Sequence, residues 1–312
     1  MQRVLTCIVI VVWCGRFGEC NDGKPVNSAT QQPDRIIGPV DDTSRPREAG
    51  AVRNDNFLQM MLAWAPPGRF VMGLVRPNHY VPNHEQPVEV EHTRGFWIAH
   101  TEITQSQWQR VMQTTPWKGR FNVVSGDNYP AVYVSWNRAR EFCERLTRSE
   151  HTAGRLKGNW EYSLPTEAEW EYACRAGSKT LYSFGDNEDD LDKYAWWSNN
   201  TKAERFAHKV GRKLPNKWGL YDMHGNAREW CIDGFVETLP GQRDPVIVAE
   251  ETRIVRGGAW KASIYFSGSR NVSTLAEANA FTSFRPVLVH RRNIAWGQSD
   301  LTAVDEFEDV EY

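Results

Sequence analysis

Two acidic residues in the second half of the chain have the spacing of a cation site. Asp222 and Glu229 flank Gly225 and Ala227 in the segment that ends at Trp230. Carboxylates supply the hard oxygens that Ca²⁺ prefers, and a glycine lets backbone carbonyls turn toward an ion that takes six to eight oxygen ligands. The segment therefore predicts a calcium site, and the alternative is a hydrogen-bonded turn that holds no metal.

The cysteines are the candidate ligands for a soft metal or for a disulfide. Six occur, and Cys143, Cys174 and Cys231 are the three that lie beyond the first twenty residues. An odd number cannot pair completely within one chain. Cys143 shares a helical spacing with Trp136 and Leu146, which predicts a buried thiol. Cys174 and Cys231 are candidates for a disulfide, although the sequence gives no distance between them.

Four histidines are the other candidate metal ligands. His79, His84, His92 and His100 lie close together in the sequence. Imidazole binds zinc, copper and iron, but no two of these residues have the i, i+4 spacing that places ligands on one face of a helix. We therefore interpret them as surface or hydrogen-bonded histidines rather than as a metal site.

Composition indicates a folded chain of one large domain or two ordinary ones. The 312 residues are 40% hydrophobic and 24% charged, and the net charge is −2. This balance argues against wholesale disorder and against nucleic-acid binding driven by bulk charge. No apolar run reaches the roughly 18 residues of a membrane-spanning helix. The 14 tryptophans predict an aromatic-rich core.

The N-terminus predicts export. Arg3 precedes an apolar stretch at residues 4–14. Gly18 and Cys20 are small residues at positions −3 and −1 of a signal-peptide cleavage site after Cys20. We therefore expect a periplasmic, cell-surface or extracellular protein. A lipoprotein is only weakly supported, because neither Cys14 nor Cys20 follows a small residue.

Both ends of the chain differ in composition from the body between them. Residues 21–55 are polar and rich in Pro, Asp and Asn, which predicts a flexible linker. Residues 56–290 show no such break and are predicted to form one domain. Residues 291–312 are predicted to be an acidic tail, for which solvation is the ordinary role and docking the alternative. Its acidic residues are Asp300, Asp305, Glu306, Glu308, Asp309 and Glu311.

Short elements must position these residues. Alternation predicts a strand at residues 88–92, with residues 95–98 as its partner, and a turn at residues 66–68 predicts another strand after it. Capping boxes at Thr104 and Thr166 predict helices that begin there, and Ser135 predicts a third that ends near Arg148. The remainder, residues 178–289, predicts short strands and long structured loops.

Three motifs resemble the formylglycine-generating enzyme family, also called the sulfatase-modifying-factor family. They are Ser163–Ala173 (SLPTEAEWEYA), Trp218–Trp230 (WGLYDMHGNAREW) and Arg256–Trp260 (RGGAW), which is followed by Ser283–Arg285. Weaker matches precede them in family order, at residues 70–73, 101–104, 134–136 and 142–143. The resemblance covers about residues 57–289. It implies an α+β fold, a variant of the C-type lectin fold with little regular secondary structure.

The resemblance also implies ligands for two metals. Its calcium positions fall on Asp222, Gly225, Ala227 and Glu229, and all four residue types are compatible with Ca²⁺. Active members hold Cu(I) between two cysteines shortly after the Gly-Gly pair. Counted from Gly258, those positions are Ala262 and Ser267, and no cysteine follows Cys231. Thiolates suit Cu(I), whereas a methyl group and a hydroxyl do not. A bound Cu⁺ is therefore not expected.

Two classes of function remain open. The first is a non-catalytic family member, stabilised by Ca²⁺, that binds a peptide, protein or glycan in a groove near Trp260, Ala262, Ser267 and Arg270. No nucleic acid and no transmembrane segment are expected after the signal is removed. The alternative is the family's oxidase, which converts a sulfatase cysteine to formylglycine and would need an unrecognised metal site or a partner. The sequence favours the first, because the copper ligands are absent.

Overall fold

The computed structural model describes residues 47–76, 79–201, 203–248, 251–262, 265–292 and 294. All of them belong to the compact unit Asp34–Tyr312. The predicted signal peptide at residues 1–20 lies outside the described residues, as do most of the predicted linker and nearly all of the acidic tail. Within the described part, no helix is long and apolar enough to cross a membrane.

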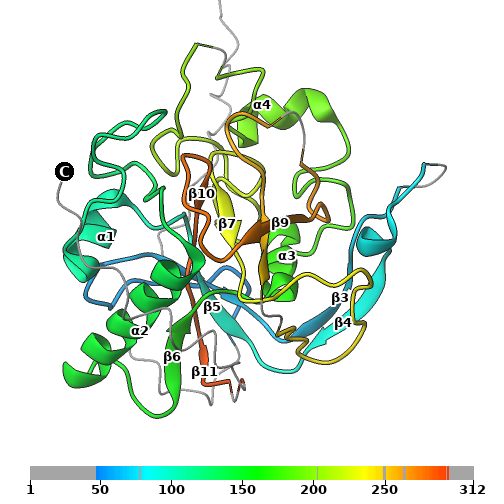
Figure 1. The fold of residues 1–312 in the computed structure, drawn as a ribbon. Helices are drawn as coiled ribbons and strands as arrows, with labels where there is room; N and C mark the ends of the chain where they lie inside the picture. Colours follow the sequence, from blue (N-terminus) through cyan, green and yellow to red (C-terminus); the bar gives the residue numbers. More distant parts are fainter. Residues whose placement is uncertain are drawn as a thin grey trace, which may run out of the picture. The chain divides into compact units, whose positions relative to one another are not determined.

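A five-stranded antiparallel sheet joins the two ends of the described chain (Figure 1). The strand order is β1–β2–β5–β11–β6, so the last strand lies between two earlier ones. The strand bounds are β1 Val52–Arg53, β2 Leu62–Ala65, β5 Phe96–Ala99, β6 Trp160–Ser163 and β11 Val287–His290. Strand β1 falls in the segment that was expected to be linker. The sheet therefore begins before residue 56, because both residues of β1 are buried against β2.

A separate two-stranded sheet forms from the predicted strands near residues 68 and 90. Strand β3 (Gly68–Met72) pairs antiparallel with β4 (Val88–His92), and a 3₁₀ turn, η1 (Asn83–Glu85), lies between them. The expected pairing of residues 88–92 with residues 95–98 is wrong. All four residues of β5 are buried, and this strand takes a central position between β2 and β11 instead.

A four-stranded sheet collects the motifs of the second half of the chain. Its order is β10–β7–β8–β9, and the β10–β7 pair is parallel. The strands are β7 Arg228–Trp230, β8 Thr252–Arg256, β9 Asn271–Thr274 and β10 Thr282–Ser283. The register sets Glu229 between Arg256 on one side and Ser283 on the other. Three motifs that are distant in the sequence therefore meet on one small sheet.

The helices begin at the predicted caps. Both capping boxes form, at Thr104 with Gln107 and at Thr166 with Glu169. The Ser135 side chain caps the helix that lies between these two in the sequence, and this helix continues beyond its expected end near Arg148. The helices are α1 Gln105–Met112, α2 Trp136–Thr152, α3 Glu167–Arg175 and α4 Leu191–Tyr194, with a 3₁₀ turn, η2, at Glu188–Asp190.

Tryptophans dominate the core, as the composition predicted. The fully buried ones are Trp97, Trp108, Trp136, Trp170 and Trp230. Two of them tie distant segments together: the indole N–H of Trp136 donates to the Cys231 carbonyl, and that of Trp230 donates to the Val134 carbonyl. Large rings that pair their N–H groups internally let a chain with short strands still bury a substantial core.

Candidate functional site

The segment before β7 is a tight turn that only certain residues allow. Asp222 and Asn226 adopt left-handed backbone conformations, with φ of 61° and 66°. Asp and Asn tolerate this region better than other non-glycine residues. Gly225 lies directly against the backbone of Trp196, where an added Cβ would come within 2.2 Å of the carbonyl oxygen. The motif is therefore required by backbone packing, independently of any metal.

Glu229, one of the four predicted calcium ligands, already has polar partners at both oxygens. Its Oε2 accepts from Arg285 Nε at 2.6 Å and from Trp170 Nε1 at 2.7 Å, and its Oε1 accepts from Arg285 Nη2 at 2.6 Å. Both charged side chains are fully buried. Burial lowers the pKa of Arg285, but Glu229 raises it and the net shift is upward. Through these hydrogen bonds Glu229 connects β7 to Trp170 of α3 and to Arg285 in the segment before β11.

Asp222 and Glu102 differ from Glu229, because each keeps one oxygen without a partner. Asp222 Oδ2 accepts from the Gly211 N–H at 2.7 Å, and Glu102 Oε1 accepts from Asn226 Nδ2 at 3.0 Å. Among the described residues, neither Asp222 Oδ1 nor Glu102 Oε2 has a hydrogen-bond partner, although both are buried. Burial raises the pKa of Asp222 to about 6, and burial followed by the charge of Asp222 raises the pKa of Glu102.

These residues form a carboxylate-rich cluster of Glu102, Asp222, Glu229 and Arg285. Arg285 pairs directly with Glu229, and the charges of Glu102 and Asp222 also act on it. Unpaired buried oxygens are costly unless a proton or a cation satisfies them. The two unpartnered oxygens are donors of the hard type that Ca²⁺ prefers, whereas Glu229 is committed to Arg285 and Trp170. Within the described residues, no group of three or more His, Cys, Asp or Glu side chains could hold a metal ion. Backbone carbonyls such as those of Gly225 and Ala227 would have to complete the ligand set, as Ca²⁺ allows.

Sequence reasoning missed Glu102. Its motif, Thr101–Thr104, was noted only for family resemblance, and nothing local connects it to Asp222. The only signal in the sequence was that Glu102 directly precedes the apolar Ile103 and the helix cap Thr104. In the structure both Glu102 and Ile103 are completely buried.

A second cluster, the arginine-rich cluster, lies around α3. It consists of Glu167, Glu171, Arg175, Arg256 and Arg270, all buried. The Glu171 Oε1 accepts from the Gly73 N–H and from Arg175 Nε, both at 2.8 Å, and its Oε2 pairs with Arg256. Glu167 Oε1 accepts from Arg270 Nε at 2.6 Å, and Glu167 Oε2 accepts from Arg270 Nη2 at 2.8 Å. Every carboxylate oxygen of this cluster therefore has an N–H partner.

The predicted groove residues are mostly interior. Arg270 is committed to Glu167 and also donates to the carbonyls of His84 and Val236. Ser267 is fully buried, and Trp260 is 4% exposed, with its N–H 3.3 Å from the Ala280 carbonyl oxygen. Ala262 is partly exposed, and its carbonyl accepts from the Ser198 N–H. The structure thus brings these residues into the protein body rather than onto one open wall, and the groove stays a prediction.

The position of Ser267 lies beside an unpredicted thiol–imidazole pair. Cys174 Sγ is 3.8 Å from His224 Nε2, which also accepts from the backbone N–H of Ser183 at 3.1 Å. Burial raises the pKa of Cys174 to about 12 despite the opposing effect of the Ser267 hydroxyl, and burial lowers the pKa of His224 to about 4. At neutral pH the pair is therefore a protonated thiol and a neutral imidazole.

The remaining thiols are also buried. Cys143, Cys174 and Cys231 are all free, so the candidate disulfide between Cys174 and Cys231 is not formed. The prediction of a buried Cys143 is confirmed. Burial raises the pKa of both Cys143 and Cys231.

Comparison with protein families gives one match that spans most of the chain. A model described as "Sulfatase-modifying factor enzyme 1-like domain" matches residues 51–289. These bounds agree closely with the region that carries the sequence motifs.

Proteins with similar sequences have names that describe different roles. The chaperone protein LppX of Paenibacillus barcinonensis is 28% identical over 54% of this chain and 70% of its own length. The formylglycine-generating enzyme of Streptomyces coelicolor is 26% identical over 62% of this chain and 77% of its own length. The inactive C-alpha-formylglycine-generating enzyme 2 of Bos taurus is 32% identical over 42% of this chain and 38% of its own length.

A solved structure supports the fold. Treponema denticola variable protein 1 matches with a TM-score of 0.64 and 27% identity, over 73% of this chain and 94% of that one. The fold expected from the motifs, α+β with modest regular secondary structure, is confirmed.

Proposed function

The chain belongs to the sulfatase-modifying factor enzyme 1-like family, and we propose that it is an exported, non-catalytic member that binds a peptide, protein or glycan. The observation that carries this proposal is the chemistry at the two copper positions. Ala262 has no donor atom, and Ser267 is a buried hydroxyl. Cu(I) selects soft thiolates, which neither residue supplies.

The thiol nearest to Ser267 does not restore the site. Cys174 is a single sulfur with a pKa of about 12, so its thiolate is scarce at neutral pH. Its neighbour His224 is an imidazole, a weaker match for Cu(I) than a second thiolate. Family resemblance alone would suggest oxidation of a substrate cysteine, but these donors support a binding role better. The word "inactive" in one relative's name and "chaperone" in another's are consistent with such a role.

We further propose that Ca²⁺ stabilises the fold at the carboxylate-rich cluster. The unpartnered oxygens of Asp222 and Glu102 support this, together with the excess of carboxylates over arginines. Asp222 would be a ligand as the sequence predicts. Glu102 would take the place predicted for Glu229, whose oxygens pair with Arg285 and Trp170.

A Cu(I) titration tests the absence of oxidase chemistry. The chain without residues 1–20 is titrated in competition with a coloured Cu(I) chelator, with calcium present throughout. The parent chain is expected to bind no copper tightly, whereas a variant with Ala262→Cys and Ser267→Cys is expected to gain a one-to-one site. The double variant shows that a two-thiol site can be detected in this fold.

Two matched variants locate any unexpected copper. Tight binding by the parent chain that disappears in Cys174→Ser or His224→Ala would place a copper site at that pair. Tight binding that survives both changes would place it elsewhere. Either result would overturn the non-catalytic proposal and favour the oxidase alternative.

A further inference from the structure

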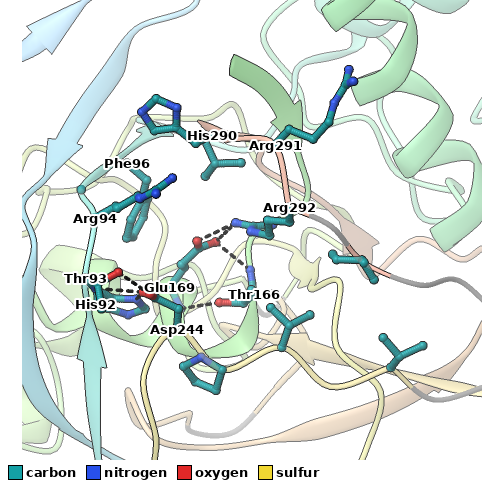
Figure 2. Close-up of a pocket in the computed structure, with 16 residues that line it drawn as sticks. His92, Thr93, Arg94, Phe96, Thr166, Glu169, Asp244, His290, Arg291 and Arg292 are labelled. Atoms are coloured by element: carbon teal, nitrogen blue, oxygen red, sulfur yellow. Dashed lines mark hydrogen bonds and ion pairs between the residues drawn. The ribbon is translucent and has the colours of Figure 1, made fainter. Parts of the chain in front are cut away.

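A cavity of about 530 Å³ is lined by no residue of the carboxylate-rich or the arginine-rich cluster. It opens between the β4–β5 connection, the start of α3, the segment 244–248 and the end of β11 (Figure 2). Its apolar lining comes from Phe96, Pro245, Val246, Val248, Val289 and Ile294. None of the predicted calcium, copper or groove residues lines it.

Most charges around this cavity are already paired. Glu169 accepts from the Thr166 N–H at 2.9 Å and pairs with Arg292. Asp244 accepts from the Thr93 backbone N–H at 2.9 Å and from its hydroxyl. Figure 2 shows these groups around the centre of the cavity, with Arg94 and Arg292 extending from opposite sides.

Two further arginines line the cavity and differ in what they contact. Arg291 pairs with Glu161 at 3.1 Å, and in Figure 2 it extends away from Arg94. Arg94 is exposed, and its guanidinium has no hydrogen bond or ion pair to any residue that the structure describes. Arg94 is thus an available anchor for an anion, next to an apolar wall that includes Phe96. The two features together suit a carboxylate carried by an apolar peptide segment.

The chain itself contains such a segment, among the residues that follow Ile294. Residues 305–312 read Asp-Glu-Phe-Glu-Asp-Val-Glu-Tyr, in which acidic side chains surround Phe307 and Val310. Ile294 lines the cavity, and residues 295–304 connect it to this segment. Ten extended residues span up to about 35 Å, which is ample for a return to the same cavity. Because the contact would be intramolecular, an effective concentration in the range of roughly millimolar lets even a weak interaction be occupied.

We propose that residues 305–312 dock into this cavity of their own chain, with a carboxylate on Arg94 and Phe307 against the apolar wall. The acidic tail would then be a built-in ligand of a surface that is separate from the family's functional positions. This inference does not depend on the proposed function.

The test uses the full chain with a photo-crosslinking phenylalanine analogue in place of Phe307. After irradiation, crosslinked residues are mapped by mass spectrometry on a mixture of isotopically light and heavy chains. The expected products join position 307 to Phe96, Val246 or Val289 of the same chain. Products that join light to heavy chains would show docking onto a second copy, and products elsewhere on the surface would show no specific site. Either result would overturn the proposal.

Matched arginine variants test the anchor. Arg94→Gln is expected to reduce the yield of cavity crosslinks roughly fivefold, the ratio that about 1 kcal/mol gives for an exposed ion pair. Arg291→Gln removes the same charge from the same cavity but acts on a residue paired with Glu161, and it is expected to change the yield little. Equal loss in both variants, or no loss in Arg94→Gln, would contradict the proposal. Unchanged thermal unfolding of both variants would show that the fold is intact.

Discussion

The arginine-rich cluster and the carboxylate-rich cluster are two buried ionic regions with opposite balances. Around α3, two glutamates are shared by three arginines, and every carboxylate oxygen has an N–H partner. Beside β7, Arg285 is the one arginine of a cluster with three carboxylates and pairs with Glu229, and two oxygens of the other two carboxylates have no partner among the described residues. The first needs nothing more to be stable, whereas the second needs protons or a cation. Burial alone therefore does not distinguish a fully paired cluster from one that still needs a proton or a ligand, but the count of unsatisfied oxygens does.

The largest effect should come from breaking the arginine-rich cluster. Glu171→Gln leaves Arg175 without its buried counter-charge and leaves Arg256 with Glu167 alone. The free energy of unfolding is therefore expected to fall by about 3–5 kcal/mol. The same change in the other cluster, Glu102→Gln, is the control, because burial already favours the neutral form of Glu102. Without calcium, that variant is expected to be as stable as the parent chain. Urea unfolding measures both, and equal losses would show that the two clusters do not differ as argued.

The pH dependence of stability should reveal a buried carboxyl next to the arginine-rich cluster. Burial, and next the charge of Glu167, raise the pKa of Asp233 to about 7. The folded state therefore binds a proton that the unfolded state has released, and this contribution grows as pH falls from about 7 toward 4. Its slope is up to about 1.4 kcal/mol per pH unit.

Comparison with Asp233→Asn isolates that contribution. The lowered pKa values of His92 and His224 act in the opposite direction, since their stabilising effect is lost as pH falls below their unfolded values. They are common to both chains and cancel in the difference. Chemical unfolding at pH 7, 6 and 5 should show the difference in stability between parent and variant changing with pH. A constant difference would contradict the raised pKa.

Calcium should stabilise the carboxylate-rich cluster and have no effect on the other. At a concentration one hundred times its dissociation constant, Ca²⁺ is expected to add about 2.7 kcal/mol to the free energy of unfolding. Asp222→Asn should remove most of this gain, and Glu102→Gln should reduce it. Thermal unfolding with Ca²⁺ or with a chelator measures the effect. A gain that persists unchanged in Asp222→Asn would place the ion elsewhere.

The smallest effect concerns the thiols. Because Cys143, Cys174 and Cys231 are buried and free, a thiol reagent should label none of them in the native chain, and a reducing agent should leave the unfolding temperature unchanged. In Glu171→Gln, Cys174 and Cys231 should react faster, since both lie near the arginine-rich cluster. Cys143 packs in a different core region and provides the reference. Equal labelling of all three would indicate global unfolding rather than local loosening.

Much of the local structure follows from the sequence. Thr104 and Thr166 cap helices because the bonds of a capping box join residues three apart, which need no tertiary context. The alternation in β4 also predicts its bounds. The partner of β4 was not predictable in this way, because the exposed and buried faces of a strand do not identify which neighbour it pairs with.

The candidate site was predictable in part. The sequence singled out Asp222 and Glu229. Both are buried, and the charge of Glu229 contributes to the raised pKa of Asp222. It did not indicate that Glu229 pairs with Arg285 and Trp170, which are 56 and 59 residues away, or that Glu102 belongs to the same cluster. Arg270 was assigned to the predicted groove because of its family position, and only the structure shows that it pairs with Glu167.

What the sequence determined by itself is chemical identity: the ordered family motifs, the helix caps, and the lack of any cysteine after Cys231. Donor atoms that are missing from a segment cannot be supplied by folding that segment. What only the tertiary structure decided is pairing, because contacts between residues such as Glu102 and Asn226, 124 positions apart, depend on how whole elements pack. Whether a buried carboxylate meets an arginine or keeps a free oxygen is therefore settled by long-range packing.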